Sequence, residues 1–256
     1  MINGGSAGFN SVTFYGDHYR VTATQHRNII ELQESIIEEE KLSYINDLMS
    51  RIPFIRGVWI ILKEFLILRK LVLILSLGIL LYFILNSNLI DENSLNIINN
   101  TLEEHSILVQ IISFIFIGTM LIKLTPLGKY HAAEHMAANT FKRNKNFTVE
   151  DVIMSSRVHN SCGTNLVVFV FIFLFIFSFF IEGFMIFLAS WSFGYEVVII
   201  ENRWIKKILE PFYLIGGIMQ YMLFTSKPEV KHIKVAIKAI ERLIELEEKF
   251  FYTRKN

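Results

Sequence analysis

The residues best suited to chemistry are two histidines and a glutamate in the segment His131-Ala132-Ala133-Glu134-His135. If this segment is helical, the two histidines lie one turn apart on the same face and can bind one metal ion. Glu134 is then placed to take a proton from a water that the metal has acidified. The order H-x-x-E-H is that of the inverted zincins, in which the histidines bind zinc and the glutamate is the general base. A surface helix with two ordinary histidines fits this short pattern equally well.

A third metal ligand is expected among residues that follow this motif in the chain. His159 and Cys162 are three residues apart, a spacing that allows them to share one helix face. Glu196 lies in apolar sequence, where an ionisable group is costly unless it has a partner such as a metal or Arg157; a plain interfacial residue is the alternative. Arg157 is suited to stabilising an oxyanion or an anionic headgroup. The predicted catalytic residues are Glu134 and Arg157, and the candidate ligands of a divalent metal, with zinc favoured, are His131, His135, Glu196, His159 and Cys162.

The elements that must position these residues are predicted to be membrane-spanning helices. The hydrophobic fraction is 52% and the mean hydropathy is +0.42, above the apolar content of an average soluble domain. Apolar blocks occupy 71–85, 107–124 and 166–200. Because one span needs roughly 20 residues, the last block predicts two helices joined near Glu182-Gly183. The alternative is a buried hydrophobic hairpin of a soluble protein, which the number and purity of the blocks disfavour.

The distribution of Lys and Arg predicts how these spans are oriented. The loop at 86–106 contains no Lys or Arg and is expected outside, whereas the basic segments 123–165 and 203–207 are expected inside. The shorter apolar segment 211–224 predicts an interfacial or re-entrant helix. The chain is therefore predicted to be a multi-pass protein of the cell membrane with both termini cytoplasmic.

The segments outside the apolar blocks predict smaller elements. Runs rich in Val, Thr and Tyr flank Gly16-Asp17, a pattern typical of a β-hairpin. Apolar residues recur on one helix face at 230–250, with lysines opposite, so an amphipathic helix that contacts anionic headgroups is expected there. The fold class is thus predicted as a mainly α-helical integral membrane protein with about four transmembrane helices, a small N-terminal β-hairpin region and cytoplasmic amphipathic helices. Three segments are predicted. The N-terminal part, 1–53, has strands at 11–15, 19–24 and 27–33 and a helix at 36–51. The membrane domain, 54–226, has a surface helix at 54–68 and a motif loop at 125–165, and a C-terminal helix follows at 227–256.

Charge and cysteine content exclude some partners and folds. The net charge is +1, so no nucleic-acid partner is expected. The single cysteine, Cys162, rules out an intrachain disulfide framework.

Several motifs in a fixed order resemble those of the bacterial YqhQ family, multi-pass membrane proteins described as being of unknown function or as candidate metal-dependent enzymes. The family's motifs are R-G-V, Y-H-G-A-E-H-K, L-T-x-E-N-V, S-R-x-H-x-R-C-G-T and S-Y-E. The corresponding segments here are R-G-V at 56–58, Y-H-A-A-E-H at 130–135, F-T-V-E-D-V at 147–152, S-R-V-H-N-S-C-G-T at 156–164 and Y-E at 195–196. The resemblance implies a location in the plasma membrane of a bacterium.

The N-terminal segment departs from the family pattern. The family opens with G-G-Q-A-V-I-E-G-V-M-M-R-G-P, of which Gly4-Gly5-Ser6-Ala7, Val12 and Gly16 remain. Asn10 and Tyr15 replace the family's Glu and Arg, and Met136 replaces the Lys after the second histidine. A specialised substrate is expected if this segment contacts one.

Two functions of different classes fit these observations. The first is a zinc hydrolase that acts at the cytoplasmic membrane interface on a peptide, a lipid or a lipid-linked intermediate. The second is a non-catalytic membrane scaffold, assembly partner or transporter, in which the polar residues only hold helices together. The lipid bilayer is an expected partner in both cases, and a metal analysis combined with a turnover assay distinguishes them.

Overall fold

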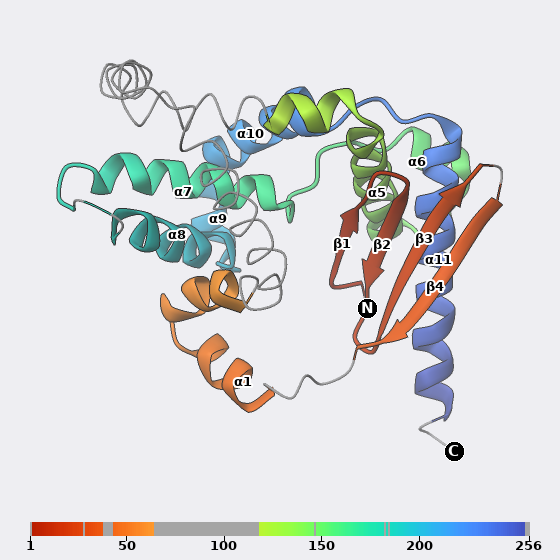
Figure 1. Ribbon diagram of the computed structural model, residues 1–256, viewed down its shortest axis with the longest axis horizontal. Helices are drawn as coiled ribbons and strands as arrows, with labels where there is room; N and C mark the ends of the chain where they lie inside the picture. Colours follow the sequence, from red (N-terminus) through yellow and green to blue (C-terminus); the bar gives the residue numbers. More distant parts are fainter. Residues whose placement is uncertain are drawn as a thin grey trace, which may run out of the picture.

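The computed structural model describes residues 2–27, 29–37, 43–63, 118–145, 147–181, 183 and 185–253. In the N-terminal part of these residues, four strands form one antiparallel sheet in the order β1-β2-β3-β4. The strands are β1 (Gly4–Ala7), β2 (Ser11–Tyr15), β3 (Tyr19–His26) and β4 (Ile29–Ile36). Strands that follow each other in sequence also lie side by side, so the sheet is a meander (Figure 1).

The β2–β3 hairpin forms because apolar and polar residues alternate along both strands. One face carries fully buried side chains, which are Val12, Phe14, Val21 and Ala23. On the other face the hydroxyl groups of Thr13 and Thr22 share a 2.8 Å hydrogen bond. The turn contains Gly16 and Asp17, so the predicted hairpin is confirmed. The strand predicted at 27–33 is confirmed as part of β4.

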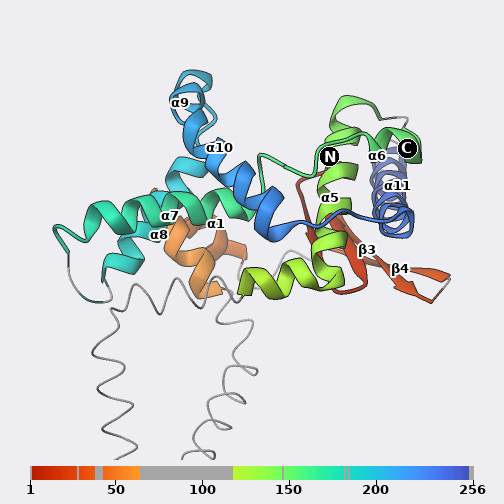
Figure 2. The same ribbon diagram turned by 90° about the horizontal axis from the view of Figure 1, so that it is seen from above.

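Two helices, α5 (Pro126–Arg143) and α11 (Val230–Thr253), cover the buried face of the sheet (Figures 1 and 2). The amphipathic helix predicted at 230–250 is confirmed, and its apolar face packs on α5, β2 and β3. Burying each large side chain of this face contributes roughly 1.5–3 kcal/mol. The helical side of the core consists of Tyr130, Ala133, Met136, Ala137, Ile233, Ala236, Ile240 and Leu243, among others.

The other described helices lie beside this core. The short α6 (Val149–Ile153) begins with a capping box, in which the Thr148 and Asp151 side chains bind each other's backbone N–H groups. Residues 55–63 and 118–124 are also helical. The remaining helices are α1 (Ser43–Arg51), α7 (Gly163–Phe177), α8 (Met185–Val198), α9 (Arg203–Ile208), α10 (Glu210–Met219) and the π-helix η1 (Gln220–Phe224).

The prediction of an integral membrane protein with about four transmembrane helices is wrong. None of the helices in the described ranges combines the length and the apolar character needed to cross a bilayer. The third and fourth predicted spans are α7 and α8, with 15 and 14 residues. At 1.5 Å per residue they measure about 22 and 21 Å, less than the roughly 30 Å hydrocarbon core. The first predicted span, 71–85, and residues 107–117 of the second lie outside the described residues.

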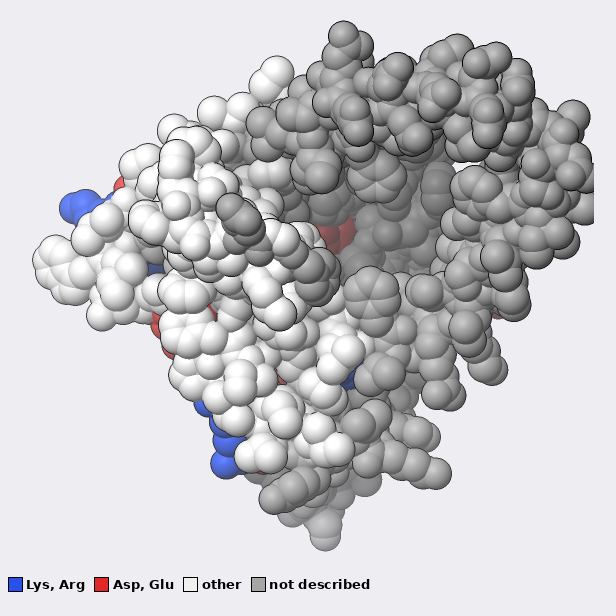
Figure 3. All heavy atoms as spheres, turned by 60° about the vertical axis from the view of Figure 1, so that its left-hand side comes forward, with Lys and Arg blue, Asp and Glu red and all other residues white. Residues whose placement is uncertain are grey.

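The physical reason for the error is that apolar sequence does not fix helix length or surroundings. The block at 166–200 breaks at the predicted turn, and the two short helices pack against each other. Gly194 allows this contact, because a Cβ atom there would lie 3.0 Å from the backbone nitrogen of Val170. Few charged side chains are visible on the described surface at the α7–α8 side of the molecule (Figure 3). The side chains exposed near the turn include Phe175, Phe179, Phe180 and Met185.

The plasma-membrane location, which was predicted from the same spans and from the family resemblance, is also corrected. The finding that overturns it is the lack of a spanning helix among the described residues. The predicted division at 53/54 and 226/227 stays a prediction. The sheet, α5 and α11, which that division assigns to different segments, share one hydrophobic core.

Candidate metal centre

The His-Glu-His motif lies on α5, which small residues allow to pack tightly. Ala132, Ala133 and Ala137 are fully buried, so the helix backbone approaches its neighbours closely. Pro126 occupies the first turn, where its missing N–H costs nothing. The i,i+4 spacing then places His131 and His135 on one face, with ring centroids 4.3 Å apart.

Both histidine rings are oriented by backbone carbonyl groups. The Nδ1 atom of His135 lies 2.7 Å from the carbonyl oxygen of Arg157, and that of His131 lies 3.1 Å from the carbonyl oxygen of Phe224. Because a carbonyl oxygen only accepts, each Nδ1 must carry the hydrogen. Each Nε2 atom therefore keeps its lone pair for a metal, an arrangement that metal-binding histidines commonly share. Phe224 ends the π-helix η1, a type of helix often found at functional sites.

Cys162 completes a cluster of three potential ligands. Its Sγ atom lies 3.7 Å from His131 Nε2, and one ligand atom each from His131, His135 and Cys162 lies within 4.8 Å of the others. Burial raises the pKa of the Cys162 thiol, but its contacts with His135 and Thr164 outweigh this and bring the pKa below its usual value. A lowered pKa favours the thiolate, which is the form that binds metals.

Glu134 lies against this cluster and is almost completely buried, with 6% of its surface exposed. One carboxylate oxygen is 3.5 Å from His135 Nε2. Burial raises the pKa of Glu134 to about 7, and a positive charge on His131, when that ring is protonated, opposes this shift. A carboxyl group with this pKa can both accept and return a proton near neutral pH.

Gly5 of β1 leaves the space that the Glu134 carboxylate occupies. A Cβ atom at position 5 would lie 2.4 Å from Glu134 Oε1. The Gly4-Gly5 pair noted in the sequence therefore belongs to the site. Sequence reasoning considered only reactive side chains and therefore missed Gly5 and the carbonyl groups of Arg157 and Phe224. For Gly5 the available signal was the G-G pair in the family's opening motif.

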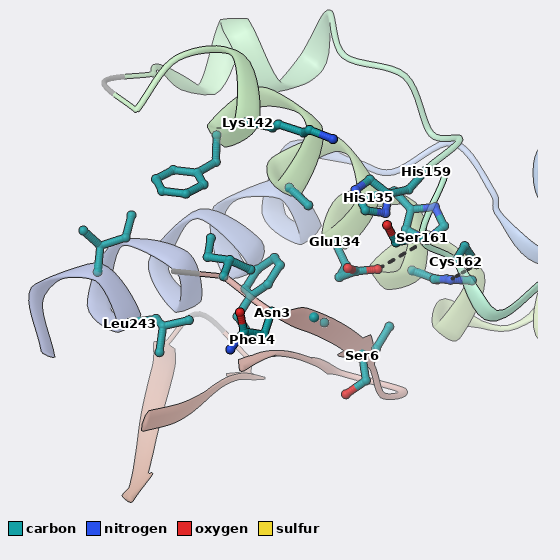
Figure 4. A pocket seen from close by; sticks show the side chains of 18 of the residues that line it. Asn3, Ser6, Phe14, Glu134, His135, Lys142, His159, Ser161, Cys162 and Leu243 are labelled. Atoms are coloured by element: carbon teal, nitrogen blue, oxygen red, sulfur yellow. Dashed lines mark hydrogen bonds and ion pairs between the residues drawn. The ribbon is translucent and has the colours of Figure 1, made fainter. Parts of the chain in front are cut away.

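The cluster opens into a cavity of about 990 Å³ between β1, α5, α11 and the segment at 159–163. Glu134, His135 and Cys162 line one side, and Phe14 and Leu243 line the other (Figure 4). Polar and apolar walls facing each other in this way are typical of a small-molecule or substrate site.

His159 and Arg157 lie near the cluster without belonging to it, and their predicted roles as metal ligand and catalytic residue stay predictions. His159 lines the cavity, with its ring centroid 5.7 Å from that of His135, but is not in the group of ligand atoms within 4.8 Å. Burial, helped by the charges of His135 and Lys142, lowers the pKa of His159 to about 4 and keeps the ring neutral. The Arg157 guanidinium stacks 4.1 Å over the Tyr221 ring, and it is the carbonyl of Arg157 that contacts His135.

The structure places Glu196 in an ion pair with Arg56, apart from the histidines. Its carboxylate accepts hydrogen bonds from the Arg56 guanidinium and from the backbone N–H of Phe54. Hydrogen bonding to Arg56 is the main cause that lowers the pKa of Glu196. The R-G-V and Y-E motifs therefore meet here, and Gly57 packs against Tyr195. Glu196 is not among the clustered ligand atoms found in the described residues.

We expect Glu196→Gln to destabilise the fold and leave metal binding unchanged. The change removes one partner of a charged hydrogen-bond network, a loss worth roughly 1–3 kcal/mol. Urea unfolding measures this loss, and Glu201→Gln, at an exposed position of the same region, is the matched control with no expected effect. Loss of metal in Glu196→Gln without loss of stability would return Glu196 to the list of ligands.

Comparisons with known proteins agree with the resemblance seen in the motifs. The chain is similar to "Uncharacterized protein YqhQ" of Bacillus subtilis (strain 168), with 25% identity over 166 residues. The aligned region covers 60% of this chain and 52% of that protein. The chain thus spans about half the length of this curated relative. No solved structure matches it. A family profile matches residues 61–246, most of the chain. The likeness to YqhQ is confirmed, and the chain belongs to the family described as "Protein of unknown function (DUF1385)".

Proposed function

We propose that this protein is a metal-dependent hydrolase whose zinc ion is held by His131, His135 and Cys162. The observation that carries the proposal is the orientation of the two imidazole rings. Their Nδ1 atoms are bound to carbonyl oxygens, and a ligand atom of each ring lies within 4.8 Å of the others and of the Cys162 sulfur. A merely structural pair of histidines has no need for this convergence.

The donor set fits zinc in type and spacing. With bonds of about 2.0–2.1 Å to nitrogen and 2.3 Å to sulfur, a tetrahedral ion separates these ligands by roughly 3.6 Å. The 3.7 Å between Cys162 Sγ and His131 Nε2 is close to that separation. Imidazole and thiolate ligands both suit zinc. Three protein ligands leave a fourth position open, as catalytic zinc sites require.

Glu134 carries the proton transfers of the proposed hydrolysis. Zinc, when bound, supplies the Lewis acidity that makes a water nucleophilic at neutral pH. Glu134 lies buried 3.5 Å from His135 Nε2, and there it accepts a proton from the attacking water and returns it to the leaving group. His159, kept neutral by its lowered pKa, is placed on the cavity wall to donate a hydrogen bond to the substrate oxygen on which charge develops.

The first test is metal content. We expect about one zinc per chain in protein purified without a chelator or a histidine tag, and loss of that zinc in His131→Ala and in Cys162→Ser. His26→Ala is the matched control and should keep the ion, because His26 pairs with Glu31 at the surface. Absence of stoichiometric metal from the parent protein would overturn the proposal. Bound zinc without hydrolysis of any substrate class would favour a structural zinc site instead.

A further inference from the structure

The cavity beside the metal cluster follows one strand of the sheet. All four residues of β1 line it, together with Phe14 of β2, but no residue of β3 or β4 does. Within the described residues β1 is an edge strand, since it pairs only with β2. The cavity therefore runs along β1 at the edge of the sheet, next to Glu134 and the histidines (Figure 4).

The pairing register shows which backbone groups of β1 point away from β2. Ala7 lies opposite Val12, so Gly8 lies opposite Ser11, and the N–H of Gly8 donates to the carbonyl of Ser11. In an antiparallel ladder, hydrogen-bonded and non-hydrogen-bonded pairs alternate. Gly4 and Ser6 therefore bond to β2, whereas the N–H and C=O groups of Gly5 and Ala7 point outward. No hydrogen bond joins these outward groups to any described residue.

From this arrangement we propose that the substrate is an extended, acidic polypeptide segment that pairs with the outer edge of β1. Its backbone binds the outward N–H and C=O groups of Gly5 and Ala7, as in other cases of strand addition to a sheet edge. This inference rests on the proposed function for the reaction, but the binding itself needs no metal.

Two features favour a peptide over a lipid chain or a compact metabolite. The outward N–H and C=O groups recur every second residue, about 7 Å along a strand. The backbone of a second strand has hydrogen-bonding groups at the same spacing, whereas a hydrocarbon chain has none. The side chains of β1 are small or absent, so the Glu134 carboxylate lies directly against the strand at Gly5, beside a backbone bound along its edge.

Two lysines near the end of α5 favour carboxylates in the bound segment. Lys142 and Lys145 line the cavity, and neither lysine forms an ion pair with a described residue. An ammonium group near a bound peptide attracts a carboxylate, with a preference that weakens in high salt. The cavity is also lined by four acidic residues, which are Glu134 of the site, Asp17, which accepts a hydrogen bond from Asn3, Glu247, which His18 binds, and Glu248. The preference for carboxylates is therefore expected only beside the two lysines.

A peptide bound in this way can be hydrolysed by water with Glu134 as the only proton carrier. The water oxygen bonds to the carbonyl carbon of a peptide bond above Glu134, and Glu134 accepts a water proton. The C–N bond breaks, and the nitrogen leaves as an amine with the proton that Glu134 returns. The carbonyl carbon becomes a carboxylic acid, and water is the only co-reactant.

Binding of synthetic peptides to chelator-treated, metal-free full-length protein tests the inference. The probe is a mixture of fluorescent, terminally blocked decapeptides with glutamates at two fixed positions and other positions randomised, measured by fluorescence polarisation. Methylation of alternate backbone nitrogens should weaken binding roughly tenfold or more, because lost edge hydrogen bonds cost about that much. Replacing the two glutamates with glutamines should weaken binding several-fold at low salt.

Matched protein variants locate the contact. Ala7→Pro removes one outward N–H, at an edge position where proline is tolerated, and should weaken binding roughly tenfold. Leu32→Pro is the matched control on the opposite edge strand, β4. It removes the N–H of residue 32, which the register also points outward, and it should leave peptide binding unchanged. Thermal unfolding checks that both variants fold. If either does not fold, the comparison of methylated and unmethylated peptides on the parent protein decides whether β1 pairs with the peptide.

The outcomes separate this inference from the proposed hydrolase. Equal affinity for methylated and unmethylated peptides, or equal effects of the two proline variants, overturns pairing with β1. Methylation-sensitive peptide binding without any hydrolysis by zinc-loaded protein supports the pairing and removes the hydrolase. Hydrolysis of esters by protein that does not bind the peptides supports the hydrolase and removes the pairing with β1.

Discussion

Glu134→Gln is expected to lower hydrolytic turnover by roughly 10²–10⁴-fold while the protein keeps its zinc. The amide has nearly the same shape and fits the space over Gly5 that the carboxylate now fills. It cannot accept a proton from water, so the general-base contribution is lost. In the proposed site His131, His135 and Cys162 hold the zinc without Glu134, so we expect the zinc to stay. Mass spectrometry of peptide products and elemental analysis of the same sample measure the two quantities.

The matched control is Glu150→Gln on α6. Glu150 is exposed and lies outside the cavity, so its replacement should change neither turnover nor zinc content. If Glu134→Gln loses zinc together with turnover, Glu134 is a ligand and not a base. If it keeps full turnover, another group accepts the proton and the assignment of Glu134 is wrong.

The local part of the site could be predicted from sequence, because helix geometry alone decides it. The spacing of His131 and His135 puts both rings on one face of any helix, and α5 is a helix there. Sequence did not show whether Cys162 or His159 lies with the two histidines, because this depends on the path of the chain between α5 and α7. That path places the sulfur 3.7 Å from His131, whereas His159 is not among the described residues whose ligand atoms cluster there.

Glu196 and Arg157 show what side-chain types do not reveal. The sequence offered Arg157 as the partner of Glu196, but the fold brings Arg56 to it instead. Arg157 contributes a backbone carbonyl to the site, and any residue type has such a group. Sequence reasoning identifies reactive side chains well and backbone contributions poorly, since the latter depend on the course of the chain.

The same distinction explains the results for the fold. Alternating residues in β2 and β3 and the apolar stripe of α11 are short-range patterns, and the elements they predicted are present. Hydropathy at 166–200 measures composition without its surroundings. It does not distinguish a bilayer span from two short helices such as α7 and α8 that pack on each other.

Phe14→Ala is expected to cost about 3–5 kcal/mol of unfolding free energy, the usual range for removing a buried aromatic side chain. Phe14 is fully buried between the sheet and the helices and lies opposite Gly5 in the register. Such a loss is a large part of the roughly 5–15 kcal/mol that stabilises an ordinary domain. Urea unfolding measures it.

Phe9→Ala, in the adjacent β1–β2 turn, is the matched control. The same side chain is removed there from a position that is 64% exposed, so we expect a change within about 0.5 kcal/mol. Because Phe14 also lines the cavity, its loss frees space beneath β1 and should weaken binding of the acidic peptides, while zinc stays bound in the folded protein. Similar stability losses in both variants would mean that the sheet does not pack on α5 and α11 as described, and the edge of β1 would then have no fixed position beside Glu134.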